Sequence, residues 1–186
     1  SVSGHPGLTT REALPGWTRV VDGHGKKMSK AIGNVINPLD LIDQFGADAT
    51  RFALASQEVQ ARRTLRMSDQ AAEGGQRFAT KLWNATRFCQ SNGIGASDTL
   101  AAPEAKLAVN QWIIGETARV REEVDTALEA FRFNDAANAL YAFVWGRVCD
   151  WYVKFAKPLL AADAPERAET QQVMAWVLDQ CMIFLH

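Results

Sequence analysis

The stretch NDAANALYAFVWGRVCDWYVKFAKP, residues 134–158, decides the fold of this chain. Its apolar residues recur at intervals of three and four, which places them on one stripe of an α-helix. Asn134 is a typical N-cap residue, and Pro158 cannot continue a helix interior. We therefore predict a long helix with one buried face, whose inward positions are Ala137, Leu140, Tyr141, Val144, Val148, Trp151 and Phe155.

Three further segments have the same helical spacing of apolar residues. Ser68 is expected to cap a helix that ends near Ser91, a second helix spans about residues 107–130, and a last one begins at Pro165. Four amphipathic helices joined by short and medium loops predict a mainly α fold, a helical bundle. The other inward positions are Ala71, Phe78, Leu82, Ala85, Cys89, Val120, Val124, Leu128, Val173, Val177 and Phe184, and the tryptophans expected in the core are Trp112, Trp145, Trp151 and Trp176.

The residues before the bundle predict a short irregular α+β segment. β-Branched residues favour a strand over Trp17–Asp22. Asn37-Pro38 is typical of an N-cap followed by the first residue of a helix, which Gly46 ends. A second short helix is expected over 47–56, and a connector or a strand over 57–66.

The composition is that of an ordinary globular protein. Of the 186 residues, 47% are apolar and 22% are charged, which excludes a disordered tail and a low-complexity linker. The longest uninterrupted apolar run, 139–145, is far shorter than the roughly 20 residues that span a bilayer. The three cysteines are scattered, and the chain does not open with a basic and then apolar signal segment. These features predict a soluble, cytoplasmic protein without a membrane partner.

Positive charge is concentrated in the N-terminal part of the chain. Residues 1–100 contain 12 Lys and Arg against 9 Asp and Glu, whereas residues 101–186 contain 8 against 12. An anionic partner is therefore expected to meet the N-terminal half first. The alternative is a solvated surface of mixed charge.

The residue types that most often bind metals or act as nucleophiles form no recognisable site. His5, His24 and His186 do not pair with one another or with cysteines at the spacing of zinc ligands. No Ser-His-Asp pattern and no acid–base pair of carboxylates stands out. The residues around Lys26 do not complete a Walker A loop, because Lys27 stands where Ser or Thr is required. We expect no metal site in this chain.

The segment GKKMSKAIGN, residues 25–34, concentrates positive charge on a flexible loop. Lys26, Lys27 and Lys30 place three ammonium groups within five residues. Lysine is a mobile point charge, so Lys27 and Lys30 are candidates to stabilise the charge on a departing pyrophosphate. The alternative is a basic surface loop with no particular role.

Lys27-Met28-Ser29-Lys30-Ala31 resembles the KMSKS signature loop of class I aminoacyl-tRNA synthetases. The resemblance continues in the family's order over about residues 17–186. The runs near the loop are similar to those of the valine, isoleucine and leucine enzymes. The later runs are similar to the anticodon-binding helices of valyl-tRNA synthetases. The matching runs are GNVINPLD (33–40), GADATRF (46–52), FATKLWNATRF (78–88), FRFNDAA (131–137) and CDWY (149–152).

The resemblance implies an ATP-dependent ligase that activates valine and transfers it to tRNA-Val. Residues 1–66 are then the KMSKS-loop and connecting part of a catalytic region, and residues 67–186 are an all-α anticodon-binding domain that is C-terminally truncated. The family uses ATP, with Mg²⁺ as the counter-ion of its phosphates. The ATP-binding residues implied are Lys27, Met28, Ser29 and Lys30, of which Lys27 and Lys30 have the catalytic role.

The resemblance also places recognition of the anticodon stem-loop on the helical domain. Lys81, Asn84 and Phe88 can share one face of a helix, and a cation, an amide and an aromatic ring suit a nucleotide of a single-stranded loop. The alternative is that Phe88 belongs to the core and Lys81 to the solvent. The candidate tRNA-binding residues are Lys81, Asn84, Arg87 and Phe88 for the anticodon, and Arg62, Arg63 and Arg66 for backbone phosphates.

The chain departs from the family's pattern in two ways. Ala31 replaces the last serine of the signature, and the lost hydroxyl is expected to weaken the contact with the nucleotide. No HIGH motif, Rossmann core or editing domain is visible, so we expect that this chain alone does not form valyl-adenylate. Two alternatives stay open: an isoleucyl- or leucyl-tRNA synthetase, and a stand-alone helical module that binds RNA or protein.

Overall fold

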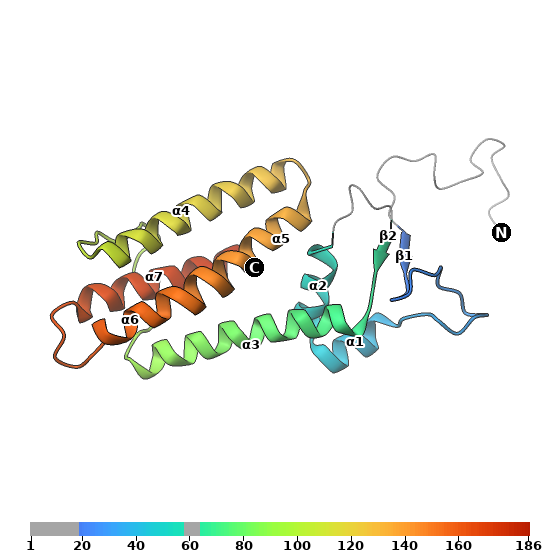
Figure 1. Ribbon diagram of the computed structural model, residues 1–186, viewed down its shortest axis with the longest axis horizontal. Coiled ribbons are helices and arrows are strands. Elements are labelled where there is room, and N and C mark those ends of the chain that lie inside the picture. Colours follow the sequence, from blue (N-terminus) through green and yellow to red (C-terminus); the bar gives the residue numbers. More distant parts are fainter. Residues whose placement is uncertain (1–18, 58–63) are drawn as a thin grey trace.

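The computed structural model describes residues 19–57 and 64–186. A small sheet and two short helices lie at one end of a long helical bundle (Figure 1). The predicted mainly α fold, with a helical bundle after a short α+β segment, is confirmed. The elements are β1 (Arg19–Val21), α1 (Pro38–Phe45), α2 (Ala47–Ala55), β2 (Thr64–Arg66), α3 (Asp69–Ser91), α4 (Ala108–Glu129), α5 (Phe133–Tyr141), the π-helical segment η2 (Ala142–Tyr152), α6 (Val153–Leu159) and α7 (Arg167–Leu185).

The two strands form a parallel pair. Val20 of β1 lies opposite Leu65 of β2, so the sheet joins chain segments on either side of α1 and α2. Parallel strands need a crossover connection, which these two helices provide. The predicted strand is confirmed at 19–21 and the strand alternative for the connector at 64–66, while Trp17 and Thr18 lie outside the described residues.

Local sequence signals set the ends of the short helices. The Asn37 side chain accepts a hydrogen bond from the Leu39 amide at 3.2 Å, and Pro38 is the first helical residue, as predicted. Gly46, with a φ of 92°, separates α1 from α2. A side chain at this φ would be strained, which explains the glycine.

α2 and α3 approach each other closely at one glycine. A Cβ atom at Gly75 would lie 2.5 Å from the carbonyl oxygen of Ala49, a distance that real Cβ contacts do not show. The neighbouring Gly74 has no such neighbour within 4 Å. Gly75 therefore permits the helix crossing, whereas Gly74 only lowers the helical propensity of α3.

Four helical rods form the bundle. α3 and the continuous helix made of α5, η2 and α6 run in one direction, while α4 and α7 run in the opposite direction (Figure 1). Ser68 caps α3 as predicted, because its Oγ accepts a hydrogen bond from the Ala71 amide at 3.3 Å. α7 begins at Arg167, two residues after the predicted start at Pro165.

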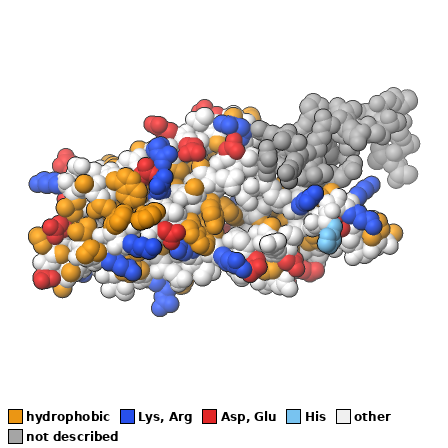
Figure 2. Space-filling model, viewed as in Figure 1, with side chains coloured by type: hydrophobic (Ala, Val, Ile, Leu, Met, Phe, Trp, Pro, Cys, Tyr) orange, Lys and Arg blue, Asp and Glu red, His pale blue; other side chains and the backbone are white. Residues whose placement is uncertain are grey.

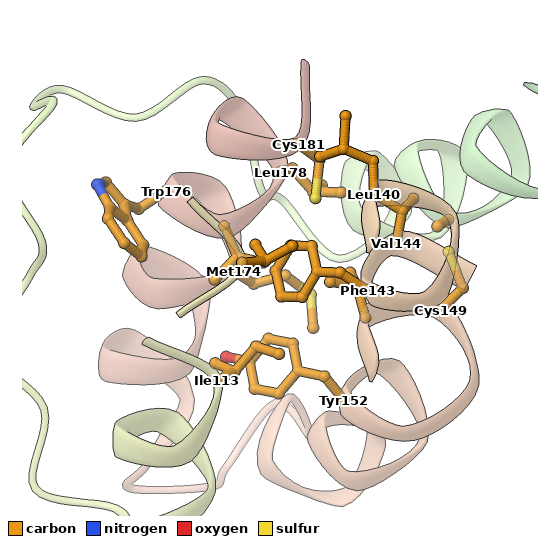
Figure 3. Close-up of a cluster of buried hydrophobic side chains, with 14 of the residues drawn as sticks. Ile113, Leu140, Phe143, Val144, Cys149, Tyr152, Met174, Trp176, Leu178 and Cys181 are labelled. Carbon is orange, nitrogen blue, oxygen red and sulfur yellow. The ribbon is translucent and has the colours of Figure 1, made fainter. Parts of the chain in front are cut away.

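The core lies between these four rods. Ile113 of α4, Tyr152 of η2 and Met174 of α7 are among its largest fully buried side chains. In Figure 3 the Tyr152 ring extends from the η2 helix toward Ile113. Trp176 is buried, as predicted, and its Nε1 donates a hydrogen bond to the Leu100 carbonyl at 3.0 Å.

The middle of the long helix is π-helical, which displaces its buried stripe. Hydrogen bonds in a π-helix join residues five apart rather than four, so each turn holds more residues. Tyr152 and Ala156 are therefore buried where an α-helical period predicts Trp151 and Phe155. The prediction for these two aromatic residues is wrong: Trp151 is 52% exposed and Phe155 is 47% exposed.

Four smaller predictions for the bundle are also wrong. Tyr141 and Leu128 lie at the edges of their apolar stripes and are exposed. Asn134 is not an N-cap, because α5 already begins at Phe133. Pro158 does not stop the helix before it but lies in the last turn of α6, which ends one residue later at Leu159.

Candidate functional site

The segment after β1 folds into a tight turn around one carboxylate. Asp22 Oδ1 accepts hydrogen bonds from the backbone amides of His24 at 3.1 Å and of Lys26 at 2.8 Å. Lys27 then pairs with Val21 in an antiparallel bridge, which brings the chain back alongside β1. The basic loop predicted from the sequence is therefore anchored at its first residues.

The side chain of Asn34 closes the other end of the loop. Its Nδ2 donates to Asp22 Oδ2 at 2.8 Å and to the Lys27 carbonyl at 3.2 Å. Its Oδ1 accepts a hydrogen bond from the Ser29 amide at 2.9 Å. The side-chain amide of Asn34 thus joins the turn at Asp22 to the signature residues Lys27 and Ser29. We call Asp22 and Asn34 the loop clamp.

The loop clamp favours the ionised form of the Asp22 carboxyl. The hydrogen bond from Asn34 is the largest cause that lowers the pKa of Asp22, and the bond from the Lys26 amide comes next. The bond from the His24 amide and the charge of His24 lower the pKa further. Acidification is therefore expected to loosen the loop clamp, because a protonated carboxyl has less capacity to accept hydrogen bonds.

The four signature residues divide into exposed cations and partly buried anchors. Lys27 and Lys30 are exposed, and neither forms an ion pair with a described residue. Met28 and Ser29 are half-buried, and Met28 Sδ accepts a hydrogen bond from the Ile36 amide at 3.4 Å. The loop therefore fixes Met28 and leaves two ammonium groups available to an anion.

Arg66 of β2 lies beside this loop. Gly25 has a φ of 81°, and a Cβ atom there would lie 3.3 Å from Arg66 Nη2. The structure thus brings one of the three predicted phosphate-binding arginines next to the lysine-rich loop. The other two, Arg62 and Arg63, lie outside the described residues.

Lys81 has partners within the bundle. Its Nζ lies 2.7 Å from Asp150 Oδ1 of η2 and 5.0 Å from the centroid of the Trp145 ring. The two side chains of the ion pair are 33% and 37% exposed. Lys81 is therefore neither a free solvent cation nor buried, and a phosphate near it would compete with Asp150.

The other predicted tRNA-binding residues of α3 lie in two environments. Asn84 and Arg87 are exposed. Phe88 is half-buried and packs against the core, and Lys157 Nζ of α6 lies 5.8 Å from the centroid of its ring. The structure therefore brings Lys81 and Phe88 together with the η2–α6 helix and leaves Asn84 and Arg87 in solvent.

The sequence reasoning missed a group of aromatic side chains on the bundle surface. Trp112 of α4, Trp151 of η2 and Phe155 of α6 lie together, and we call them the aromatic seam. The ring centroids of Trp151 and Phe155 are 5.7 Å apart at an interplanar angle of 29°, and Trp112 meets Phe155 edge-on at 6.4 Å. Figure 2 shows hydrophobic side chains gathered over the bundle, with charged side chains between them.

Two family models match the chain on different parts of this structure. The model described as tRNA synthetases class I (I, L, M and V) matches residues 17–67, the range that holds the loop clamp. The model described as the anticodon-binding domain of tRNA ligase matches residues 110–186, the range that holds most of the bundle. Both parts of the chain therefore match proteins of translation, in the order that the sequence predicts.

Curated valine–tRNA ligases are similar to the chain over most of its length. That of Cereibacter sphaeroides is 58% identical over 169 residues, which cover 90% of this chain and 17% of the relative. That of Ruegeria pomeroyi is 57% identical over 90% of this chain and 17% of its own length, and that of Rhizorhabdus wittichii is 50% identical over 93% and 19%. The chain is therefore similar to valine–tRNA ligases over about nine-tenths of its length.

A solved structure shares the fold of this chain. LeuRS from Agrobacterium radiobacter K84, in a LeuRS-tRNA-LeuAMS ternary complex, matches with a TM-score of 0.71 over 91% of this chain and 20% of that chain. At 19% identity this likeness shows the fold alone. The chain spans about a fifth of the length of the curated valine–tRNA ligases it matches. Because these relatives are valine enzymes, the alternative of an isoleucyl- or leucyl-tRNA synthetase is not favoured.

Within the described residues, no group of three or more His, Cys, Asp or Glu could hold a metal ion, and no helix is long and apolar enough to cross a membrane. The three cysteines of the chain are free and buried. Burial raises the pKa of Cys149 to about 11 and that of Cys89 to about 12, and it raises the pKa of Cys181 as well. These thiols are therefore protonated at neutral pH and are poor nucleophiles.

Proposed function

We propose that this chain is part of a valine–tRNA ligase, which joins valine to tRNA-Val with cleavage of ATP. In this proposal the chain supplies two parts of that enzyme: the loop that contacts the ATP phosphates and the domain that binds the anticodon stem-loop. The observation that supports it most is the 58% identity to the Cereibacter sphaeroides enzyme over 90% of the chain. The division into a loop segment, 1–66, and a bundle domain, 67–186, stays a prediction.

The loop suits an ATP phosphate site because its cations are exposed and its base is fixed. Lys27 and Lys30 project from a segment that the loop clamp closes, so their ammonium groups can approach a polyphosphate at little conformational cost. Charge that develops on the departing pyrophosphate would be stabilised by these lysines. When bound, Mg²⁺ would share the phosphate charge as the counter-ion of ATP. Ala31 offers no hydroxyl, so Ala31→Ser is expected to strengthen this contact.

The bundle and β2 suit tRNA in two different ways. Arg66, with the predicted Arg62 and Arg63, would bind backbone phosphates, which adds affinity without sequence specificity. The anticodon residues proposed on α3 are Lys81, Asn84, Arg87 and Phe88. The three free cysteines suit the reducing cytoplasm, where we propose that the protein acts.

Binding of the chain to a tRNA-Val transcript, across a series of salt concentrations, tests this proposal. The matched ligand is the same transcript with its anticodon changed. Tighter binding to the unaltered anticodon is the expected result, because base contacts discriminate whereas phosphate contacts do not. Equal and steeply salt-dependent binding to both transcripts would leave only a basic surface for RNA backbone. Absence of binding to either would contradict an RNA role and favour a protein-binding module.

A further inference from the structure

Two of the three rings of the aromatic seam are exposed to solvent, while Trp112 is half-buried and packs against the core. Trp151 and Phe155 are each about half exposed, and they stack on each other. Trp112 meets Phe155 edge-on from the neighbouring helix α4. Single exposed apolar side chains are common on protein surfaces, but exposed apolar side chains that lie together mark a binding surface.

Positive charge borders the aromatic seam. Lys154 Nζ lies 5.9 Å from the centroid of the Trp151 ring. Arg147, four residues before Trp151, places its Nε 3.3 Å from Glu116 Oε2. Glu116 is also paired with Arg119 at 2.6 Å, so two guanidinium groups share one carboxylate. These four charged groups together are net positive.

We propose that the aromatic seam is a stacking site for an unpaired base of tRNA, with Lys154 and Arg147 beside the phosphates that flank this base. The inference rests on the proposed tRNA-binding function and assigns part of that function to the aromatic seam of the bundle. Aromatic rings with an accessible face bind bases by stacking, whatever the base, and neighbouring cations bind the backbone. Because Trp151 and Phe155 stack on each other, a base would stack on the ring faces that this pair leaves uncovered.

The π-helical register of η2 creates this platform. With an α-helical period, Trp151 and Phe155 would fall on the buried stripe of the helix. The π-turns place Tyr152 and Ala156 there instead and rotate the two aromatic rings to the surface. π-Helical segments occur frequently at functional sites, which agrees with a binding role for residues that this segment exposes.

RNA fits the aromatic seam better than a protein partner does. The centre of a protein interface is depleted in charged residues, and lysine in particular is disfavoured there. Lys154 lies directly over the ring of the seam's most exposed tryptophan, and a polyanion is complementary to this charge. A protein segment is therefore an outcome of the test and not the expected occupant.

The test compares variants of the chain in binding to a tRNA-Val transcript and to a hairpin of its anticodon arm with 2-aminopurine in the loop. We expect Trp151→Ala to lower the affinity about tenfold and to abolish the quenching of 2-aminopurine, because one base loses its stacking partner. Trp151→Phe keeps a ring and is expected to retain most of the affinity. Lys154→Ala is expected to reduce the slope of log affinity against log salt by about one, because one phosphate contact is lost. Trp151→Ala is expected to leave this slope unchanged.

The matched control is Trp83→Ala, which removes a tryptophan that is 65% exposed on α3. The control is expected to bind as the unaltered chain does, and circular dichroism checks that each variant keeps its helices. If the unaltered chain binds and Trp151→Ala binds equally well, the stacking site is overturned while the proposed function stands. Equal losses in Trp151→Ala and Trp83→Ala would also overturn it. If the unaltered chain binds neither RNA, the stacking site and the proposed tRNA binding fail together.

Discussion

The hydroxyl of Tyr152 donates a hydrogen bond to Oδ1 of Asn110 at 2.8 Å, and both side chains are fully buried. Asn110 donates in turn through Nδ2 to Glu169 Oε1 at 2.9 Å and to Thr170 Oγ1 at 3.3 Å. Asn110 of α4 is therefore tied to both η2 and α7 in the middle of the core. Because a buried polar group without a partner is costly, this network favours one register of the three helices.

We expect Tyr152→Phe to lower the free energy of unfolding by about 1–3 kcal/mol. The substitution keeps the ring and leaves Asn110 Oδ1 without its donor inside the core. Urea unfolding followed by circular dichroism measures the change. Tyr141→Phe is the matched control, because Tyr141 is 39% exposed, and its cost is expected to stay within about 0.5 kcal/mol. A cost for Tyr152→Phe no larger than that of the control would contradict the role of the hydroxyl.

The carboxylate of Glu169 is expected to make the stability of the bundle depend on pH. The hydrogen bond from Asn110 and then that from the Leu107 amide lower the pKa of Glu169 below its usual 4.5. A lowered folded-state pKa adds stability above the unfolded-state value, and this stability is lost as the pH falls through the folded-state value. Glu169→Gln is therefore expected to show a smaller loss of unfolding free energy on acidification than the unaltered chain. Equal losses in the two proteins would contradict the assignment.

Short-range signals account for most of what the sequence predicts correctly. Asn37 and Ser68 act within the first turns of their own helices, so α1 and α3 begin where the sequence places them. The lysine-rich loop is equally local, because its charge and its glycines stand within ten residues. Even there, the sequence does not reveal that Asn34 reaches back to Asp22, because a side-chain bond across the loop depends on the path of the folded backbone.

Contacts between distant parts of the chain account for what the sequence does not predict. Lys81 and Asp150 are 69 positions apart, and no local pattern near either residue indicates their ion pair. The aromatic seam depends on the π-turns of η2, and the periodicity of the apolar residues does not predict a π-turn there. An α-helical period applied to residues 134–158 is therefore displaced by one position from Trp151 onward.

Two adjacent glycines of α3 are expected to respond in opposite ways to alanine. Gly74→Ala is expected to raise the free energy of unfolding by about 0.5–1 kcal/mol, because alanine favours the helix and its Cβ meets nothing within 4 Å. Gly75→Ala is expected to lower it by about 1–3 kcal/mol, because its Cβ would lie 2.5 Å from the Ala49 carbonyl oxygen and push α2 away from α3. Urea unfolding measures both variants. The same sign for both would contradict the close approach of the two helices.

Asn34→Ala is expected to release the lysine-rich loop without unfolding the bundle. The substitution removes the acceptor of the Ser29 amide proton and the donor to Asp22. Hydrogen exchange at the Ser29 amide is therefore expected to become faster by about tenfold, the effect of one lost hydrogen bond on local opening. Asn84→Ala on the exposed surface of α3 is the control and is expected to leave this exchange rate unchanged. An unchanged rate in Asn34→Ala would show that the loop does not depend on the loop clamp.

The ion pair between Lys81 and Asp150 is expected to restrain the binding of RNA. Asp150→Asn keeps the size of the side chain, removes its charge and frees the Lys81 ammonium for a phosphate. Binding to a tRNA-Val transcript is therefore expected to tighten, with a slope of log affinity against log salt that is steeper by about one. Stability is expected to change by less than about 1 kcal/mol, because the pair is partly exposed. Asp125→Asn, which removes a carboxylate paired with Arg121 on α4, is the control. Equal tightening in both variants would mean that net charge alone explains the gain and that Lys81 does not contact tRNA.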